Sequence, residues 1–208
     1  VKTSKGVVGL DLTRLLTGSE GVLGIITQAT LKILPLNDCT VTIEVTFDEV
    51  SDASETIISL MTQPITPSKL EFIDAEAIKL INTIKIDHYD KKIKAAIILE
   101  IDGEKEYIDL MLKNIIKVIE INKFNKISIA DNLKDIEDLW SARKSLSPAL
   151  RVIGSHKINE DIAVPISNLT NLLNNLDVIS KKYDIKIVNF GHAGNGNIHV
   201  NLLFQSEE

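Results

Sequence analysis

AAIILEIDGEKEYIDLMLKNIIKVIEI, residues 95–121, is the stretch from which the fold of this chain is most directly predicted. Ala95 to Ile101 is apolar apart from Glu100, and a short apolar run of this kind is typical of a buried strand. From Lys105 to Ile121, apolar residues recur at helical spacing between acids and lysines, which predicts a long amphipathic helix. A buried strand followed by such a helix indicates a sheet covered by helices.

The same alternation continues on both sides of this unit. We expect further strands at 41–47, 69–73, 127–130, 157–164, 186–190 and 198–204, and further helices at 50–61, 75–84, 134–150 and 166–183. Pro148 is expected to end or kink the third of these helices. The predicted fold class is α+β, with a mixed or antiparallel sheet, helices on one face and a ferredoxin-like arrangement of the opening strands.

The pattern changes near residues 36–39. Before this point Gly18, Gly21 and Gly24 recur at every third residue, and the β-branched content of residues 25–34 predicts a strand. We therefore expect residues 1–37 to be the end of one domain and residues 38–208 to be a second one.

Both ends of the sequence suggest a piece of a longer protein. Val1 is not an initiator methionine, and residues 205–208 follow an apolar strand directly. We expect the second domain to be truncated at its C-terminus.

The composition excludes several classes of protein. Hydrophobic residues make up 44% and charged residues 25% of the chain, and the formal net charge is −6, without a basic stripe that would bind nucleic acid. The longest apolar stretches are far shorter than the ~20 residues of a membrane span. Cys39 is the only cysteine, which excludes an internal disulfide framework and favours a reducing, cytoplasmic compartment.

The glycine-rich stretch GSEGVLG, residues 18–24, is not a Rossmann fingerprint, because β-branched residues rather than a helix follow it. Its glycines predict a tight turn whose backbone N–H groups can approach an anion or a flat ring closely. From the spacing alone, a simple structural turn is the favoured explanation, because glycines mark turns more often than ligand sites.

The side chains that could bind a metal or act in catalysis are most concentrated in FGHAGNGNIHVN, residues 190–201. Asn195-Gly196 predicts a two-residue type I′ hairpin, which would place His192 directly opposite His199. Side chains that face each other in this way have Cβ atoms ~4.5–5.5 Å apart, so the two imidazoles could share one metal ion. The alternative is a polar hairpin whose histidines bond to backbone or water. Asn201 lies on the same strand face as His199, whereas Ile198 points toward a core.

Residues 9–27, GLDLTRLLTGSEGVLGIIT, closely resemble the end of the FAD domain in the vanillyl-alcohol-oxidase-type flavoproteins, in particular their glycolate oxidase and D-lactate dehydrogenase branch. In that family this stretch lies against the flavin. The resemblance implies FAD as the cofactor, residues 1–37 as the remnant of an FAD-binding α+β domain, and residues 38–208 as the substrate domain. The implied FAD contacts are Gly18, Ser19, Glu20, Gly21, Gly24 and Ile25.

The histidine motif is similar to the substrate-domain signature of the same flavoproteins. In metal-dependent members the two histidines bind a divalent ion beside the flavin, together with a downstream Glu. The resemblance therefore implies His192 and His199 as catalytic residues and as ligands of a divalent metal, either Zn, Mn or Fe, and Asn201 as a substrate contact. This sequence has Asn195 where the family usually has Asp, and it stops before the downstream Glu.

Two further segments carry the resemblance. Trp140 and Arg143 match the family's Trp-x-x-Arg motif, in which the Arg binds the substrate carboxylate through its two-point fork. Residues 157–165 resemble the family's Glu-Asp-x-x-Val-Pro strand. Because Glu160 and Asp161 are adjacent on a strand they face opposite sides, and we interpret both as structural.

The resemblance implies an FAD-dependent 2-hydroxy-acid dehydrogenase or oxidase that removes a hydride from the α-carbon of glycolate or D-lactate. Arg143 would anchor the carboxylate. A metal on His192 and His199 would bind the hydroxyl oxygen and lower its pKa, and either a metal-bound water or one histidine would assist proton removal. Expected partners are the substrate and either a second copy of the chain or flavoprotein and iron–sulfur subunits, through which the protein would reach the inner membrane. A non-catalytic metal- or ligand-binding α+β domain is the alternative. One enzyme family explains both motifs in their observed order, which favours the enzyme.

Overall fold

The computed structural model describes residues 9–86, 88–153 and 156–204. The chain forms two compact units, residues 1–36 and 37–208. The expectation about the cut ends concerns Val1 and residues 205–208, which lie outside the described residues.

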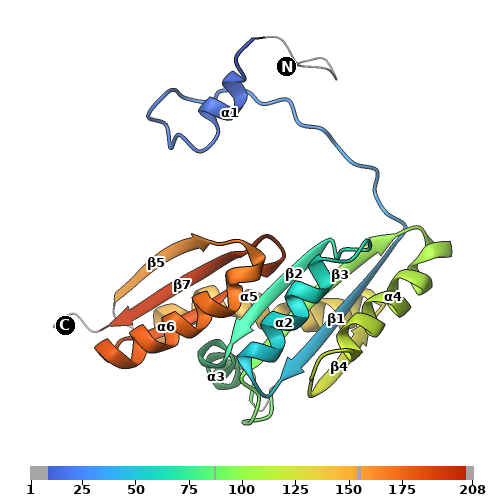
Figure 1. Cartoon of the computed structure of the whole chain (residues 1–208), viewed down its shortest axis with the longest axis vertical. Helices are drawn as coiled ribbons and strands as arrows, with labels where there is room; N and C mark the ends of the chain where they lie inside the picture. Colours follow the sequence, from blue (N-terminus) through green and yellow to red (C-terminus); the bar gives the residue numbers. More distant parts are fainter. Residues whose placement is uncertain (1–8, 87, 154–155, 205–208) are drawn as a thin grey trace. The chain divides into compact units, whose positions relative to one another are not determined.

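The second unit is built from strands and helices close to those expected from the sequence (Figure 1). The strands are β1 (Cys39–Phe47), β2 (Lys69–Asp74), β3 (Ala95–Gly103), β4 (Lys126–Ala130), β5 (His156–Ala163), β6 (Lys186–His192) and β7 (Asn197–Phe204). The helices are α2 (Val50–Met61), α3 (Ala75–Ile84), α4 (Lys105–Glu120), α5 (Leu133–Ile153) and α6 (Leu169–Tyr183), with short 3₁₀ turns η1 (Ile166–Asn168) and η2 (Ala193–Asn195).

The seven strands of the described residues form one sheet in the order β4-β1-β3-β2-β6-β7-β5. Every strand pair within the described residues is antiparallel, which settles the choice between a mixed and an antiparallel sheet. The first four strands lie in the order β4-β1-β3-β2, so the expected ferredoxin-like arrangement is confirmed. The strands β6, β7 and β5 extend the sheet beyond β2.

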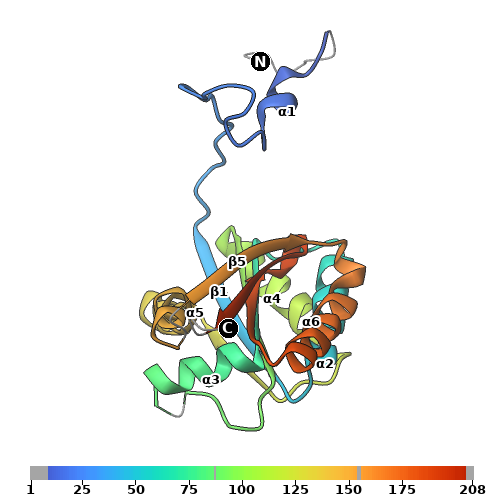
Figure 2. The same cartoon turned by 90° about the vertical axis from the view of Figure 1, so that its left-hand side faces the viewer.

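Helices cover both faces of this sheet, and the expectation of helices on one face is wrong (Figure 2). Buried residues of α2, α4 and α6 pack against one face, and buried residues of α3 and α5 pack against the other. The reason lies in the central strand β3, where Ala95 to Ile101 are all buried and alternate between the two cores. A strand that is apolar on both sides needs a cover on both sides.

Helix α5 continues through Pro148 to Ile153. The expectation that the proline could end the helix is therefore wrong. Pro148 lacks an N–H group and removes one hydrogen bond of the helix. The neighbouring side chains of Leu146, Ala149 and Leu150 are buried against the α3 side of the sheet, and their packing stabilises the helix on both sides of the proline. Within the described ranges, no helix is long and apolar enough to cross a membrane.

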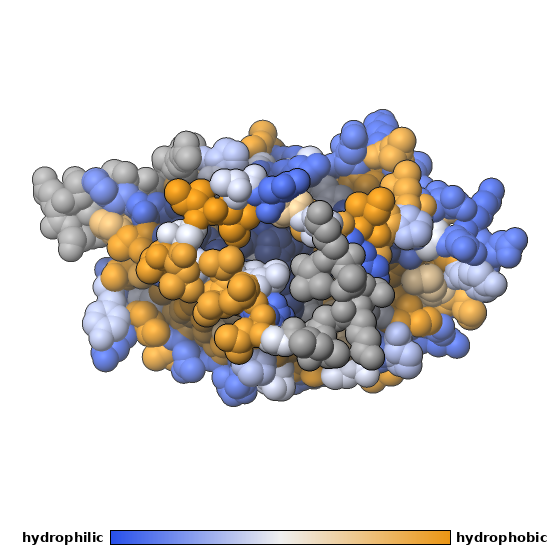
Figure 3. All heavy atoms as spheres, turned by 90° about the horizontal axis from the view of Figure 1, so that it is seen from above, coloured by the Kyte–Doolittle hydropathy of each residue, from blue (hydrophilic) through white to orange (hydrophobic). Residues whose placement is uncertain are grey.

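The described part of the first unit, residues 9–36, contains the short helix α1 (Leu12–Leu16), whose N-cap Asp11 accepts a hydrogen bond from the Arg14 N–H. The strand predicted for residues 25–34 does not form. A strand needs a neighbour for its N–H and C=O groups, and the described part of this unit, residues 9–36, contains none. Large apolar side chains of this unit are open to solvent, and Ile25, for example, is 88% exposed. Figure 3 shows exposed hydrophobic residues, coloured orange, on the face that it presents.

Candidate active site

The two histidines lie at adjacent strand ends on the α5 side of the sheet. Strand β6 pairs with β7 so that His192 faces Asn197 and Phe190 faces His199. The predicted register, in which His192 faces His199 directly, is therefore wrong. A type I′ turn needs positive φ at two positions, whereas here Gly196 alone has it (φ 73°) and η2 lengthens the connection.

His192 and His199 are nevertheless neighbours, because they form a diagonal pair on the same face of the sheet. Their ring centroids are 5.1 Å apart and the ring planes are nearly perpendicular. The His192 side chain is 54% exposed. The two imidazoles are therefore close to each other at a solvent-accessible position, as expected, although the strand register differs from the predicted one.

Each imidazole contacts a carboxylate through its Nδ1 atom. His192 Nδ1 contacts Glu71 Oε1, and His199 Nδ1 contacts Asp161 Oδ1. Asp161 lies opposite His199 on β5, while Glu71 comes from β2 on the other side. Glu71 was not among the candidates predicted from the sequence, and Asp161 was interpreted as structural.

Arg143 joins the same cluster from helix α5. Its Nε donates to Glu71 Oε2 at 2.7 Å, and its guanidinium carbon lies 4.4 Å from the centre of the Phe190 ring. Glu71 therefore contacts both Arg143 and His192. The Arg143 side chain is 13% exposed, and its two Nη groups make no hydrogen bond within the part of the chain that the structure describes.

Arg143 and Trp140 line a pocket of about 450 Å³ between α5 and the sheet. The other lining residues are Lys69, Glu71, Glu100, Ile136, Glu137 and Lys144. Trp140 is fixed by a hydrogen bond from its Nε1 to Glu100 Oε2 at 3.1 Å. The pocket has the size of a small-molecule site, and Arg143 supplies the cation that a carboxylate needs.

Asn201 lies two residues beyond His199 on the same face but is completely buried. Its Nδ2 donates to the carbonyl of Val188 at 3.0 Å, and its Oδ1 has no hydrogen-bond partner among the described residues. A direct contact with a substrate therefore requires this side chain to become accessible.

The predicted flavin contacts lie in the first unit. Gly18 and Gly21 have φ values of 80° and 82°, and Glu20 between them has 50°. The N–H groups of Ser19 and Val22 donate within the turn, to the carbonyls of Leu16 and Ser19, and an added Cβ at Gly18 or Gly21 would meet no atom within 4 Å. Ser19 is half-buried, while Gly24 and Ile25 are exposed. This open turn fits close contact with a flat or anionic group.

The histidine pair fits a metal ion only in part. Imidazoles whose Nδ1 atoms contact carboxylates are typical metal ligands. Two ligands are fewer than the three of a typical catalytic zinc site. Among the residues that the structure describes, no group of three or more His, Cys, Asp or Glu side chains is arranged to hold a metal.

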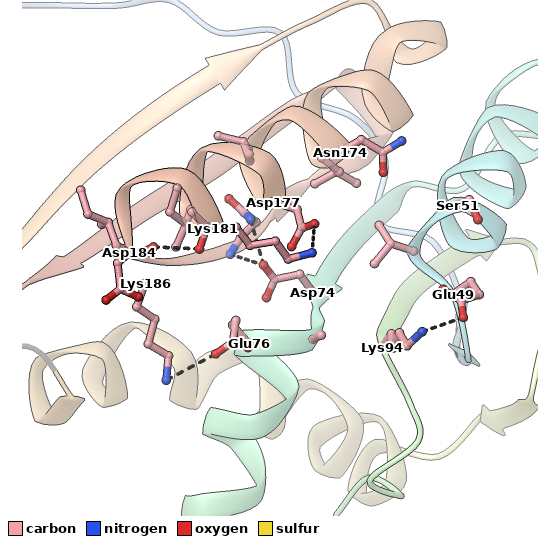
Figure 4. Close-up of a pocket in the computed structure, with 18 residues that line it drawn as sticks. Glu49, Ser51, Asp74, Glu76, Lys94, Asn174, Asp177, Lys181, Asp184 and Lys186 are labelled. Carbon is pink, nitrogen blue, oxygen red and sulfur yellow. Dashed lines mark hydrogen bonds and ion pairs between the residues drawn. The ribbon is translucent and has the colours of Figure 1, made fainter.

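A larger cavity of about 740 Å³ lies elsewhere, lined by residues of α2, α3, α6 and β6 (Figure 4). Its buried carboxyl, Asp74, accepts hydrogen bonds from the Ala77 N–H and from Asn189. Burial raises the pKa of Asp74 to about 7, although these donors oppose the shift. Since Asp74 links β6 to the start of α3 and the neighbouring Lys181 pairs with Asp177, we assign this cavity no catalytic role.

Residues 37–208 match the family described as FAD linked oxidases, C-terminal domain. Glycolate oxidase subunit GlcD of Bacillus subtilis (strain 168) is 33% identical over 198 residues, covering 95% of this chain and 42% of the relative. D-lactate dehydrogenase of Anaerostipes hadrus is 27% identical over 207 residues, covering 95% of this chain and 43% of the relative. The chain thus spans less than half the length of these relatives.

Solved structures show the same fold at low identity. Alkyldihydroxyacetonephosphate synthase superposes with a TM-score of 0.68 at 17% identity, over 96% of this chain and 42% of that chain. For 4-ethylphenol oxidase from Gulosibacter chungangensis the TM-score is 0.57 at 10% identity, over 82% of this chain and 40% of that chain.

Proposed function

Because the chain belongs to the family of FAD linked oxidases, C-terminal domain, we propose that it forms the substrate-binding part of an FAD-dependent oxidoreductase. The proposed reaction converts a small 2-hydroxy acid, of the glycolate or D-lactate type, into the 2-keto acid. The observation that carries this proposal is the row Arg143–Glu71–His192, with His199 beside it, on one face of the sheet. A hydroxy acid needs a cation that binds its carboxylate and a base that accepts its hydroxyl proton. The Arg143 guanidinium and the two imidazoles are groups of these kinds.

Arg143 is proposed to bind the substrate carboxylate. Its Nε is engaged by Glu71, which fixes the plane of the guanidinium, and Phe190 packs against that plane. Arg143 lines the 450 Å³ pocket, and its two Nη groups make no hydrogen bond among the described residues, so they remain as donors for a ligand. A guanidinium held in this way can form two hydrogen bonds to a carboxylate without reorganising.

His192 and His199 are proposed to act at the substrate hydroxyl. Oxidation removes a hydride from the α-carbon and a proton from the hydroxyl oxygen; FAD, when bound, supplies the redox chemistry by accepting the hydride. One imidazole can accept the proton, or the two can hold a divalent metal (Zn, Mn or Fe) that would supply positive charge beside the hydroxyl. Both uses require an unprotonated ring nitrogen.

The glycine turn is proposed to contact the FAD through Gly18, Ser19, Glu20, Gly21, Gly24 and Ile25. Residues 1–37 would then belong to the flavin domain and residues 38–208 to the substrate domain. We further propose that the whole protein is cytoplasmic and acts either as a homodimer or with flavoprotein and iron–sulfur subunits.

Arg143→Lys in the full-length protein is expected to lower kcat/KM for the 2-hydroxy acid by about tenfold or more, which corresponds to about 1.4 kcal/mol. When the lysine amine pairs with Glu71, it does not offer the substrate carboxylate the two further donors in fixed positions that the arginine guanidinium offers. Steady-state kinetics on purified enzyme would measure this. Lys134→Arg in the exposed first turn of the same helix is the control and should leave kcat/KM unchanged. Unaltered kinetics in Arg143→Lys would remove this residue from the site.

The 208-residue chain produced by itself is expected to fold but to be colourless. Binding pockets normally bury ~70–90% of a ligand's surface, and the exposed turn around Gly18 and Gly21 cannot do this alone. An absorbance spectrum of the purified chain, together with thermal unfolding, would test the point. A yellow preparation with about one flavin per chain would contradict it, since 1:1 binding requires a complete flavin site.

A further inference from the structure

Glu71 is the carboxylate to which two of the candidate site residues bind at once. It is 8% exposed, and its two oxygens are divided between Arg143 Nε and His192 Nδ1. A carboxylate paired with a guanidinium has no hydrogen to donate, because the ionised group is only an acceptor. The hydrogen between Glu71 and His192 therefore belongs to Nδ1. In the neutral ring, Nε2 then carries the free lone pair.

Asp161 stands in the same relation to His199. It lies opposite His199 in the β5–β7 pair and contacts its Nδ1 atom, which places the hydrogen of that ring on Nδ1 as well. The two carboxylates come from strands on opposite sides of the β6–β7 hairpin. They differ in setting, because the Asp161 side chain is 57% exposed whereas Glu71 is buried.

We propose that Glu71 and Asp161 are positioning residues that hold His192 and His199 in the tautomer with hydrogen on Nδ1. Both Nε2 lone pairs are then available at one place, where the ring centroids are 5.1 Å apart. Through its second oxygen, Glu71 also fixes Arg143, so that one side chain aligns the carboxylate anchor and one imidazole. The use of the Nε2 atoms rests on the proposed function, whereas the tautomers are a property of the chain alone.

Glu71→Gln separates this role from packing. The glutamine has nearly the same shape, and its carbonyl oxygen can still accept from Arg143 Nε. Its amide group then faces His192 Nδ1, which must accept a hydrogen bond and lose its hydrogen to Nε2. The substitution should therefore reverse the His192 tautomer, and Asp161→Asn should do the same to His199.

The first test is ¹⁵N NMR of the imidazole nitrogens in the 208-residue chain, at about pH 9, where an ordinary imidazole is neutral. The chain has four histidines, and His→Gln variants assign them. His192 and His199 should both show a protonated Nδ1. Glu71→Gln should shift the His192 nitrogens and leave those of His199, and Asp161→Asn should do the reverse.

A protonated Nε2 in either ring of the unsubstituted chain would overturn the inference for that ring, whether or not a variant folds. Variants that fold, by thermal unfolding, but leave both tautomers unchanged would also overturn it.

The second test is kinetic and uses the full-length protein. Because Asp161 contacts His199 and is not bonded to Arg143, Asp161→Asn should lower kcat by about tenfold or more and change KM less than twofold. Unchanged kcat would overturn the role of Asp161. If the full-length protein oxidises no 2-hydroxy acid at all, the proposed function fails while the NMR result still decides the tautomers.

Discussion

His199→Ala in the full-length protein is expected to lower kcat for the 2-hydroxy acid by at least about 100-fold, which corresponds to about 2.7 kcal/mol of transition-state stabilisation. The substitution removes one of the two imidazoles that meet at the end of the β6–β7 hairpin. It removes a proton acceptor if the ring acts as a base and a ligand if the ring holds a metal. Enzyme turnover and metal content per chain should be measured on the same preparation, and both should fall.

The matched control for this experiment is His88→Ala. His88 is exposed and its ring contacts Tyr89 edge-on, away from the hairpin, so its loss removes an imidazole without touching the proposed site. Turnover and metal content should match those of the unsubstituted enzyme. If His199→Ala retains stoichiometric metal, the pair is not the metal site, and if it also retains turnover, the proposed role of this histidine is wrong.

Gly196→Ala is expected to destabilise the fold by about 3 kcal/mol or more. The residue has a φ of 73°, a left-handed conformation that costs a residue with a Cβ about 1–2 kcal/mol. An added Cβ would also lie 2.0 Å from the carbonyl oxygen of Val164. That backbone is held in place, because the Val164 N–H donates to the Gly196 carbonyl at 3.0 Å. Forced overpacking of this kind typically adds about 1–3 kcal/mol.

Denaturant unfolding of the 208-residue chain measures this effect, with Gly194→Ala as the control two residues away. At Gly194 the nearest atom to an added Cβ is the Leu70 Cβ at 3.3 Å, a tight contact that a shift of a few tenths of an ångström relieves, and the φ is not positive. The control should therefore lose about 1 kcal/mol or less. Equal losses in the two variants would mean that the Gly196–Val164 contact does not restrain the hairpin.

Most strands and helices were predictable because their local patterns are clear. The buried run from Ala95 and the amphipathic repeat from Lys105 each indicate one element without knowledge of the rest of the chain. The two-sided cover of the sheet also had a local signal, since Ala95 to Ile101 does not alternate between apolar and polar residues. The hairpin register was not predictable from Asn195-Gly196, because only Gly196 takes the positive φ.

Only those residues of the candidate site that match the motifs of the flavoprotein family were predictable from the sequence. His192, His199 and Arg143 were named from the sequence, and the structure brings them together. Glu71 was missed because its partner His192 is 121 positions away, and a single acid in a short strand has no local signature. For Asp161, the argument that neighbours on a strand face opposite sides excluded a pair with Glu160. Its actual partner, His199, lies on another strand, and the sequence around Asp161 carries no signal of that pairing.

The β2–β6 pair is where the two halves of the sheet meet, and it has a consequence for the order of folding. The β6–β7 hairpin closes over four residues, so His192 and His199 can approach each other early. The contact of Glu71 with His192 needs the closure of a loop of more than a hundred residues, whose entropy must be overcome before the contact forms. We therefore expect the imidazole pair to form locally with the hairpin, and the alignment of Arg143 and His192 through Glu71 to form in a later folding step.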